Sequence, residues 1–186
     1  MTSLAPIGIL RVLQAICLLA ASAEAHDTAR RLILWAWSGY PLDSVLADSL
    51  QSEVTHLCVP GFASVDFAQT KVGFGNRNDL LISVRILGTC DANGDPLVDD
   101  GSALGFAMAA RGVIDPTIFL NCHAILQAIH PYLLEQPLRL RYKLLARAMV
   151  RVVRHELRHI LEQTPGHLKA GIYKARLQPI DLVSAN

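Results

Sequence analysis

The sequence predicts an α+β fold in which helices pack against a twisted, mixed β-sheet. Short apolar runs bounded by turn residues indicate strands, and stretches with apolar residues every three or four positions indicate helices. The elements follow one another in the order strand, helix, strand, strand, which favours a helix packed on a mixed sheet. No internal repeat, low-complexity tract or long linker interrupts residues 26–186, so one domain is expected there.

The first half of this domain supplies three expected strands and one expected helix. The apolar run 31–37 is closed by the turn residues 38–41, and apolar residues then recur at helical spacing over about 42–57. The expected strands are 31–37, 62–68 and 79–87. Stretches 73–78 and 91–96 have the composition of turns. The second has its glycine in the wrong position for a calcium loop and lacks the closing glutamate, so no calcium site is expected.

The second half begins with shorter elements. Short strands are expected at 103–109 and 117–120, the second following an Asp115-Pro116 turn and lying at the edge of the sheet beside a cleft. A short helix is expected over about 122–130, ending before Pro131 because proline disfavours helix continuation.

The last helix is the longest expected element. It follows Pro137, a natural first-turn residue, and runs from Leu138 to about Glu162, before the breaking residues 164–166. Its apolar stripe continues into a polar face at 155–159. A second stripe is basic, and we expect it to be a solvated face, with an anionic partner as the alternative. Its members are Arg139, Lys143, Arg147, Arg151, Arg154 and Arg158.

Residues 155–159 read His-Glu-Leu-Arg-His, which is a zinc hydrolase signature. A spacing of four places His155 and His159 one helical turn apart, so that both imidazoles reach one metal ion beside Glu156. A catalytic zinc takes three protein ligands, and His167, after the turn, is suitably placed to be the third. The alternative is a polar helix whose histidines face solvent.

This arrangement predicts a zinc peptidase mechanism. Zinc lowers the pKa of a water molecule, and Glu156 accepts its proton and returns it to the leaving amine. We therefore expect hydrolysis of a peptide or protein substrate. A serine hydrolase is not indicated, because no Gly-x-Ser-x-Gly motif is present.

Residues 1–25 resemble a secretory signal peptide. Arg11 precedes an apolar run from Val12 to Ala21, and Ala23-Glu24-Ala25 is a small-x-small cleavage site. An uncleaved anchor is the alternative, but it needs about 20 uninterrupted apolar residues. We expect a secreted or periplasmic monomer of 161 residues (186 − 25) without stable membrane association. A net charge of +1 does not suggest a nucleic-acid partner.

Three cysteines remain after residue 25, namely Cys58, Cys90 and Cys122. In an oxidising compartment they suggest one disulfide and one leftover thiol. The preferred pair is Cys90 with Cys122, because each closes an apolar, strand-like run. Three unpaired, buried cysteines are the alternative.

The run 152–161, His167 and the segment 171–175 together resemble a group of small exported bacterial zincins related to the metzincins. That group has His-Glu-Leu-Gly-His, a third histidine and a Gly-Ile-Met segment, and residues 103–107 are similar to its Leu-Gly-x-Ala stretch. The resemblance implies a metzincin-like zincin fold with a long active-site helix. It also implies that Tyr173 occupies the position of the Met-turn methionine.

Several residues depart from the pattern of that group. Arg158 replaces the glycine between the histidines, seven residues instead of five separate His159 from His167, and the middle glycine of the longer motif is absent. At the Met-turn position, Tyr173 is expected to pack, although binding the metal through oxygen or distorting the site are alternatives. These departures leave open a catalytically inactive zincin-fold protein that retains zinc for a structural or binding role.

Overall fold

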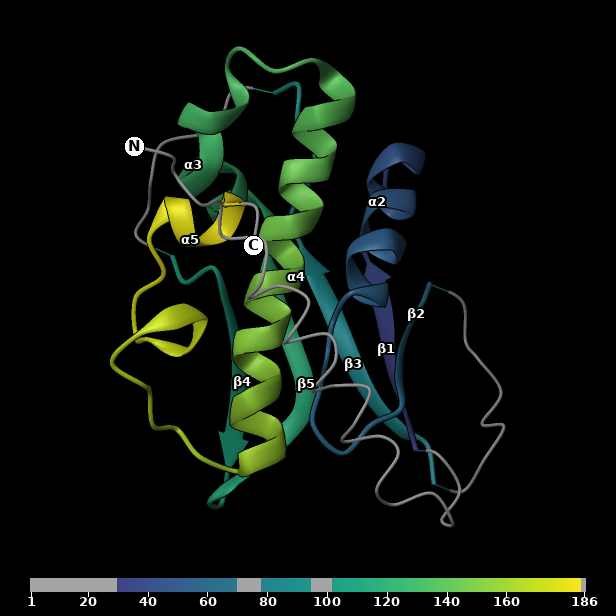
Figure 1. Ribbon diagram of the computed structural model, residues 1–186, viewed down its shortest axis with the longest axis vertical. Coiled ribbons are helices and arrows are strands. Elements are labelled where there is room, and N and C mark those ends of the chain that lie inside the picture. Colours follow the sequence, from purple (N-terminus) through teal and green to yellow (C-terminus); the bar gives the residue numbers. More distant parts are fainter. Residues whose placement is uncertain (1–29, 70–77, 95–101, 185–186) are drawn as a thin grey trace, which may run out of the picture.

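A five-stranded mixed sheet forms the centre of the protein. The computed structural model describes residues 30–69, 78–94 and 102–184. The strands are β1 (Arg31–Ser38), β2 (Ser64–Ala68), β3 (Leu80–Leu87), β4 (Gly105–Ala110) and β5 (Val113–Asn121), in the spatial order β2-β1-β3-β5-β4. Strands β2, β1, β3 and β5 are parallel neighbours, whereas β4 is antiparallel to β5 (Figure 1). The α+β prediction is confirmed.

Helices cover one face of this sheet. They are α2 (Ser44–Thr55), α3 (Cys122–Leu133), α4 (Leu138–Glu162) and the short α5 (Pro179–Val183), with a 3-10 turn η1 (Gly171–Tyr173) between α4 and α5. Helix α4 crosses the sheet with α2 packed along one side and α5 against the other (Figure 1). None of the described helices is long and apolar enough to span a membrane.

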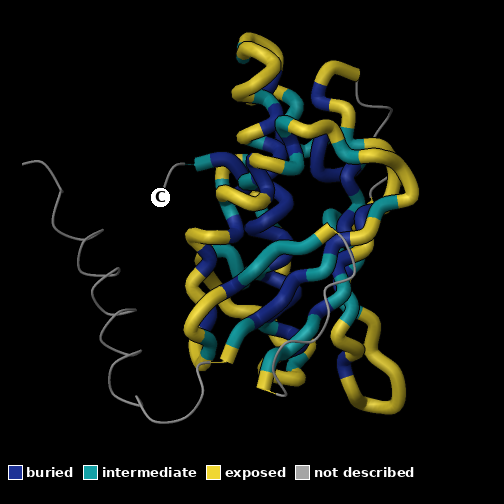
Figure 2. Tube along the Cα trace, turned by 90° about the vertical axis from the view of Figure 1, so that its right-hand side faces the viewer, coloured by how far each residue is buried: buried dark blue, intermediate teal, exposed yellow. Residues whose placement is uncertain are grey.

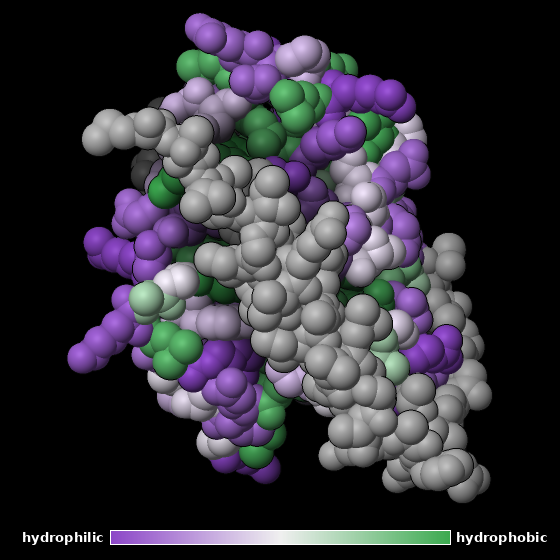
Figure 3. All heavy atoms as spheres, viewed as in Figure 1, coloured by the Kyte–Doolittle hydropathy of each residue, from purple (hydrophilic) through white to green (hydrophobic). Residues whose placement is uncertain are grey.

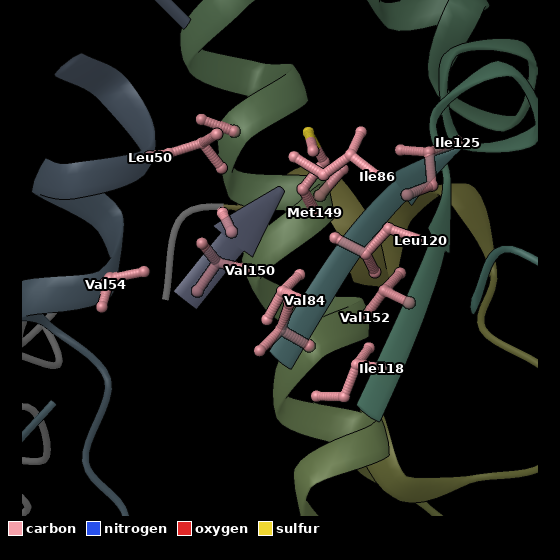
Figure 4. Packing of buried hydrophobic residues seen from close by; sticks show 14 of the residues in the cluster. Leu50, Val54, Val84, Ile86, Ile118, Leu120, Ile125, Met149, Val150 and Val152 are labelled. Atoms are coloured by element: carbon pink, nitrogen blue, oxygen red, sulfur yellow. The ribbon is translucent and has the colours of Figure 1, made fainter. Parts of the chain in front are cut away.

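The hydrophobic core lies between the sheet and α4. Alternate residues of each strand point to this layer, as the pleat of a strand requires, and they are almost completely buried. Examples are Leu34 of β1, Val84 of β3 and Leu120 of β5, which meet Met149 of α4. Figure 4 shows side chains of β3, β5 and α4 meeting in this layer, with residues of α2 beside them. Buried segments run through the middle of the molecule, and most exposed segments are loops (Figure 2).

Two prolines lie inside elements where the sequence predicts an end or a turn. Pro131 lies inside α3, so the predicted end before it is wrong. Only Tyr132 and Leu133 follow it in the helix, so the proline weakens the hydrogen bonding of the last turn alone. Burial of the Leu133 side chain offsets this loss of stability. Pro116 lies in an irregular part of β5, where one β4 residue, Met108, faces three residues of β5. A bulge tolerates proline because it needs no backbone N–H there.

The predicted edge strand is also wrong. Strand β5, which contains residues 117–120, pairs with β3 on one side and with β4 on the other. The hairpin to β4 therefore places β4 at this edge of the sheet, which a sequence pattern for two adjacent strands does not reveal.

Cys90 and Cys122 form a disulfide that joins the segment after β3 to the first residue of α3. Cys58 is also disulfide-bonded, so the expected leftover thiol is wrong. It lies exposed just after α2, and a thiol that burial does not protect is open to pairing. The expected signal peptide, residues 1–25, lies outside the described residues, as do most of the predicted turn 73–78 and the end of the predicted turn 91–96.

The basic stripe of α4 is not a uniformly solvated face, so that prediction is wrong. Only Arg139 and Lys143 are exposed. Arg147 pairs with Glu53 of α2 at 3.2 Å, and Arg151 is 9% exposed. Arg151 donates hydrogen bonds to the backbone carbonyls of Asp181 and Ser184, because α5 and the chain after it cover this side of α4.

Figure 3 shows how hydropathy is distributed over one face of the protein. Hydrophilic and hydrophobic side chains are intermixed over the described residues of that face.

Candidate metal centre

Helix α4 and the loop after it bring three histidines together. His155 and His159 lie one turn apart near the end of α4, and each is 8% exposed. His167 lies in the loop after the helix and is exposed. One potential ligand atom from each of the three lies within 4.8 Å of the others, so this cluster can hold a metal ion. The predicted grouping of these histidines is therefore present.

Backbone carbonyls fix the orientation of the two buried rings. His155 Nδ1 lies 2.7 Å from the carbonyl oxygen of Ile172, and His159 Nδ1 lies 2.6 Å from that of Thr164. A carbonyl oxygen only accepts, so each Nδ1 must carry the hydrogen and donate it. Each Nε2 is then left with a free lone pair, which is the tautomer that metal-binding histidines adopt.

These two lone pairs point at each other. The Nε2 atoms of His155 and His159 are 3.2 Å apart. With both rings neutral and both Nδ1 atoms protonated, neither Nε2 can donate, so both lone pairs are free to bind a cation or a hydrogen-bond donor beside them. Burial lowers the pKa of His155, and the pKa of His167 is also lowered, first by desolvation and then by the neighbouring histidines, so these two rings favour the neutral form that binds a metal. The geometry therefore fits a metal ion.

Glu156 lies between the histidine cluster and the edge strand. It is 7% exposed, and it accepts a hydrogen bond from the backbone N–H of Ala107 on β4. Burial raises the pKa of its carboxyl group, while His159, the Ala107 hydrogen bond and His167 oppose that rise. The result is a buried carboxyl group with a raised proton affinity beside three imidazoles.

The turn after α4 explains the missing glycine. The helix continues to Glu162, and the chain turns at Gln163, which has the left-handed conformation with φ 48°. The side chain of Gln163 accepts from the backbone N–H of Ile114 at 2.8 Å and donates to the carbonyls of Ile114 and Ile160 at 3.1 and 2.7 Å. These three hydrogen bonds offset the strain of a non-glycine residue at positive φ.

Arg158 does not line the cleft beside the histidines. It pairs with Glu162 at 2.9 Å and donates to the carbonyl oxygen of Gly166 at 3.2 Å. Its guanidinium also lies 5.6 Å from the centre of the Tyr173 ring. The residue that replaces glycine in the motif therefore holds the loop carrying His167 against α4.

Tyr173 packs against arginines of α4. Its ring lies beside Arg154 and Arg158, at 5.8 and 5.6 Å, and its hydroxyl accepts a hydrogen bond from Arg154 at 3.1 Å. The ring therefore packs, but against arginine side chains and outside the hydrophobic core. The preceding residue, Ile172, is the one whose carbonyl orients His155, so the contacts of Tyr173 also locate that carbonyl.

A cleft of about 530 Å³ opens beside His155 and Glu156. Its walls come from the start of β4, from α3, from Val152 of α4 and from the segment between η1 and α5. The α3 wall consists of Ala124, Gln127 and Ala128, which sequence reasoning missed. The spacing of Ala124 and Ala128 by one turn was the available signal, because two small side chains on one helix face leave room beside it.

Comparisons with known proteins give no further information about this site. Neither a scan against protein-family models nor searches of curated proteins and of solved structures find a match to this chain.

Proposed function

We propose that this protein is an exported zinc-dependent metallopeptidase that hydrolyses peptide bonds. His155, His159 and His167 hold the metal, and Glu156 is the general base. The observation that carries the proposal is the 3.2 Å approach of two Nε2 lone pairs whose Nδ1 atoms are both tied to backbone carbonyls. A metal ion bound beside both atoms accepts both lone pairs at once.

The donor set favours zinc. Three imidazole nitrogens, with carbonyl partners behind two of them, match the three-ligand sets of catalytic zinc sites, which leave one position open. When bound there, zinc supplies Lewis acidity, which acidifies water and polarises a substrate carbonyl. The disulfide between Cys90 and Cys122 supports export, because such bonds persist in oxidising compartments.

Glu156 is suited to moving the proton. Its carboxylate accepts a proton from the attacking water and later gives it to the amine that leaves. Burial raises its pKa towards the working pH, which improves the match between base and proton donor. The Ala107 N–H restrains one side of the carboxyl group, so Glu156 keeps a fixed position between β4 and the histidines.

Strand β4 supplies a place for an extended substrate. Among the described residues β4 pairs only with β5, so its other edge offers backbone N–H and C=O groups. An extended peptide can bind such an edge by adding a strand. Gly105 keeps β4 close to α4, because a Cβ atom at this position would lie 2.5 Å from Val152 Cγ1.

The test compares zinc content and hydrolysis in wild type and Glu156→Gln. We expect about one zinc per chain in both proteins and a loss of hydrolysis of about 10²- to 10⁴-fold in the variant, the range typical of a lost general base. A library of peptides with varied sequences detects cleavage whatever the sequence preference of the protein. Glu135→Gln, an exposed glutamate at the end of α3, is the matched control. Hydrolysis by Glu156→Gln at the wild-type rate contradicts the proposal, and so does wild type without zinc.

The same measurement separates the alternative, an inactive zincin-fold protein. Arg158 and Tyr173, which depart from the family pattern, both secure the metal-site loop and neither lines the cleft. Stoichiometric zinc without cleavage of any library peptide is the result that favours this alternative.

A further inference from the structure

Arg176 carries the only permanent positive charge among the described residues that line the cleft. It lies in the segment between η1 and α5, which runs along the left side of the view in Figure 1. It is exposed, and no hydrogen bond or ion pair joins it to another described residue. The neighbouring acid, Asp181, is occupied by Lys174 at 2.6 Å. The charge of Arg176 is therefore available to a ligand.

The remaining walls of the cleft are small and mostly neutral. Alanines from three different segments and Gly105 give it a volume of about 530 Å³. The alanines are Ala103, Ala124, Ala128 and Ala175. Small walls leave room for a substrate group as large as a glutamate side chain. Of the described lining residues, Glu156 is the only acid, and it is buried and already accepts a hydrogen bond from Ala107.

Building on the function proposed above, we propose that this cleft binds a carboxylate of the peptide substrate through Arg176. A guanidinium can hold a carboxylate by two parallel hydrogen bonds, which gives both attraction and orientation. Because His155 and Glu156 line the same cleft, the bound carboxylate lies near the bond to be cleaved. The carboxylate comes either from an acidic side chain of the substrate or from its free C-terminus.

Two peptide pairs distinguish these sources. The first pair carries glutamate or glutamine next to the scissile bond and has an amidated C-terminus. The second pair has neutral side chains and either a free or an amidated C-terminus. With zinc-loaded wild type we expect kcat/KM to be about five- to ten-fold higher for the carboxylate-bearing member of one pair, as for a partly exposed, charge-assisted contact.

Variants of Arg176 test the residue itself. Arg176→Ala is expected to remove the preference, and Arg176→Glu to reverse it in favour of a lysine-containing peptide. Arg139→Ala is the matched control, because Arg139 is exposed and lies 16 residues, or about 24 Å, before His155 on α4. It should leave the preference unchanged. A preference that persists in Arg176→Ala overturns the proposal.

Binding separates this inference from the proposed function. The same peptides are titrated calorimetrically into zinc-loaded Glu156→Gln, which retains the cleft but lacks the base. Tighter binding of the carboxylate peptides, lost with the additional change Arg176→Ala, supports the carboxylate site even where no hydrolysis is found. Hydrolysis without any carboxylate preference in rate or binding refutes the carboxylate site and leaves the peptidase proposal intact.

Discussion

The two parts of the candidate metal centre are held in different ways. His155 and His159 belong to a helix whose opposite end and flanks are packed between the sheet, α2 and α5, so their backbone is fixed by the core. His167 belongs to an exposed loop that is attached by single contacts. These are the hydrogen bond from Arg158 to Gly166, the Arg158 guanidinium over the Tyr173 ring, and an isolated β-bridge between Leu168 and Lys174. Two ligands are thus preorganised by folding, while the third depends on local contacts.

The largest expected effect is on zinc affinity, when one histidine is removed from the helix or from the loop. His159→Ala should weaken zinc binding by more than about a hundred-fold, since about 10–16 kcal/mol of binding free energy is shared among four ligands in zinc-finger sites. His167→Ala should cost roughly ten-fold, because water can replace an exposed ligand. Competition with a chromophoric chelator measures both. Equal losses show that the loop is as preorganised as the helix.

The next effect tests the rigid part. Gly105→Ala places a Cβ atom 2.5 Å from Val152 Cγ1 and 3.0 Å from the carbonyl oxygen of Phe119, so β4 must move away from α4. We expect the free energy of unfolding to fall by about 1–3 kcal/mol, as for other overpacked cores. Urea denaturation measures the change. Gly39→Ala, which meets no atom within 4 Å, is the control and should change it little.

A smaller effect tests the loop. Tyr173→Ala removes the ring between Arg154 and Arg158 and is expected to weaken zinc binding about ten-fold, the lower end of the range for groups behind the ligands. Tyr173→Phe keeps the ring and loses only the hydrogen bond from Arg154, so zinc affinity should fall only about two- to three-fold. The stability of the zinc-free protein should change little. A large fall in that stability would instead make Tyr173 part of the core.

The smallest expected effect concerns Asp181 of α5, which pairs with Lys174, the residue after η1. The hydrogen bond from Lys174, aided by that from the Gln178 backbone N–H, holds the pKa of Asp181 below its ordinary value of 3.8. A carboxyl group whose pKa is lower in the folded than in the unfolded state stabilises the fold at pH values above its unfolded-state pKa. This stabilisation is lost as the pH falls through the folded-state pKa.

Asp181→Asn should therefore lower the free energy of unfolding of the zinc-free protein by about 0.5–1 kcal/mol at pH 7. The difference should disappear well below pH 3.8. Asp48→Asn, at an exposed position on α2, is the control and should change the free energy of unfolding little at pH 7. A difference that stays constant from pH 7 into the acid range excludes the carboxylate as its cause.

Features set by local pattern were predictable from the sequence. The strands β1 and β3, the bounds of α4 and the grouping of His155 and His159 follow from apolar spacing and helical geometry. Features set by contacts between distant segments were not. The burial of Arg151 depends on where α5 packs, and the place of β4 at the sheet edge depends on a hairpin. The cleft joins four segments that are far apart in sequence.

The side chain of Gln163 behaves as an additional strand residue. Its amide exchanges hydrogen bonds with both the N–H and the C=O of Ile114, which is how residues of neighbouring strands pair. The last turn of α4 is thereby coupled to the hairpin of β4 and β5. The distance between the end of α4, which carries Glu156 and the histidines, and the β4–β5 hairpin is therefore fixed by a side-chain amide that a glycine at this turn would not provide.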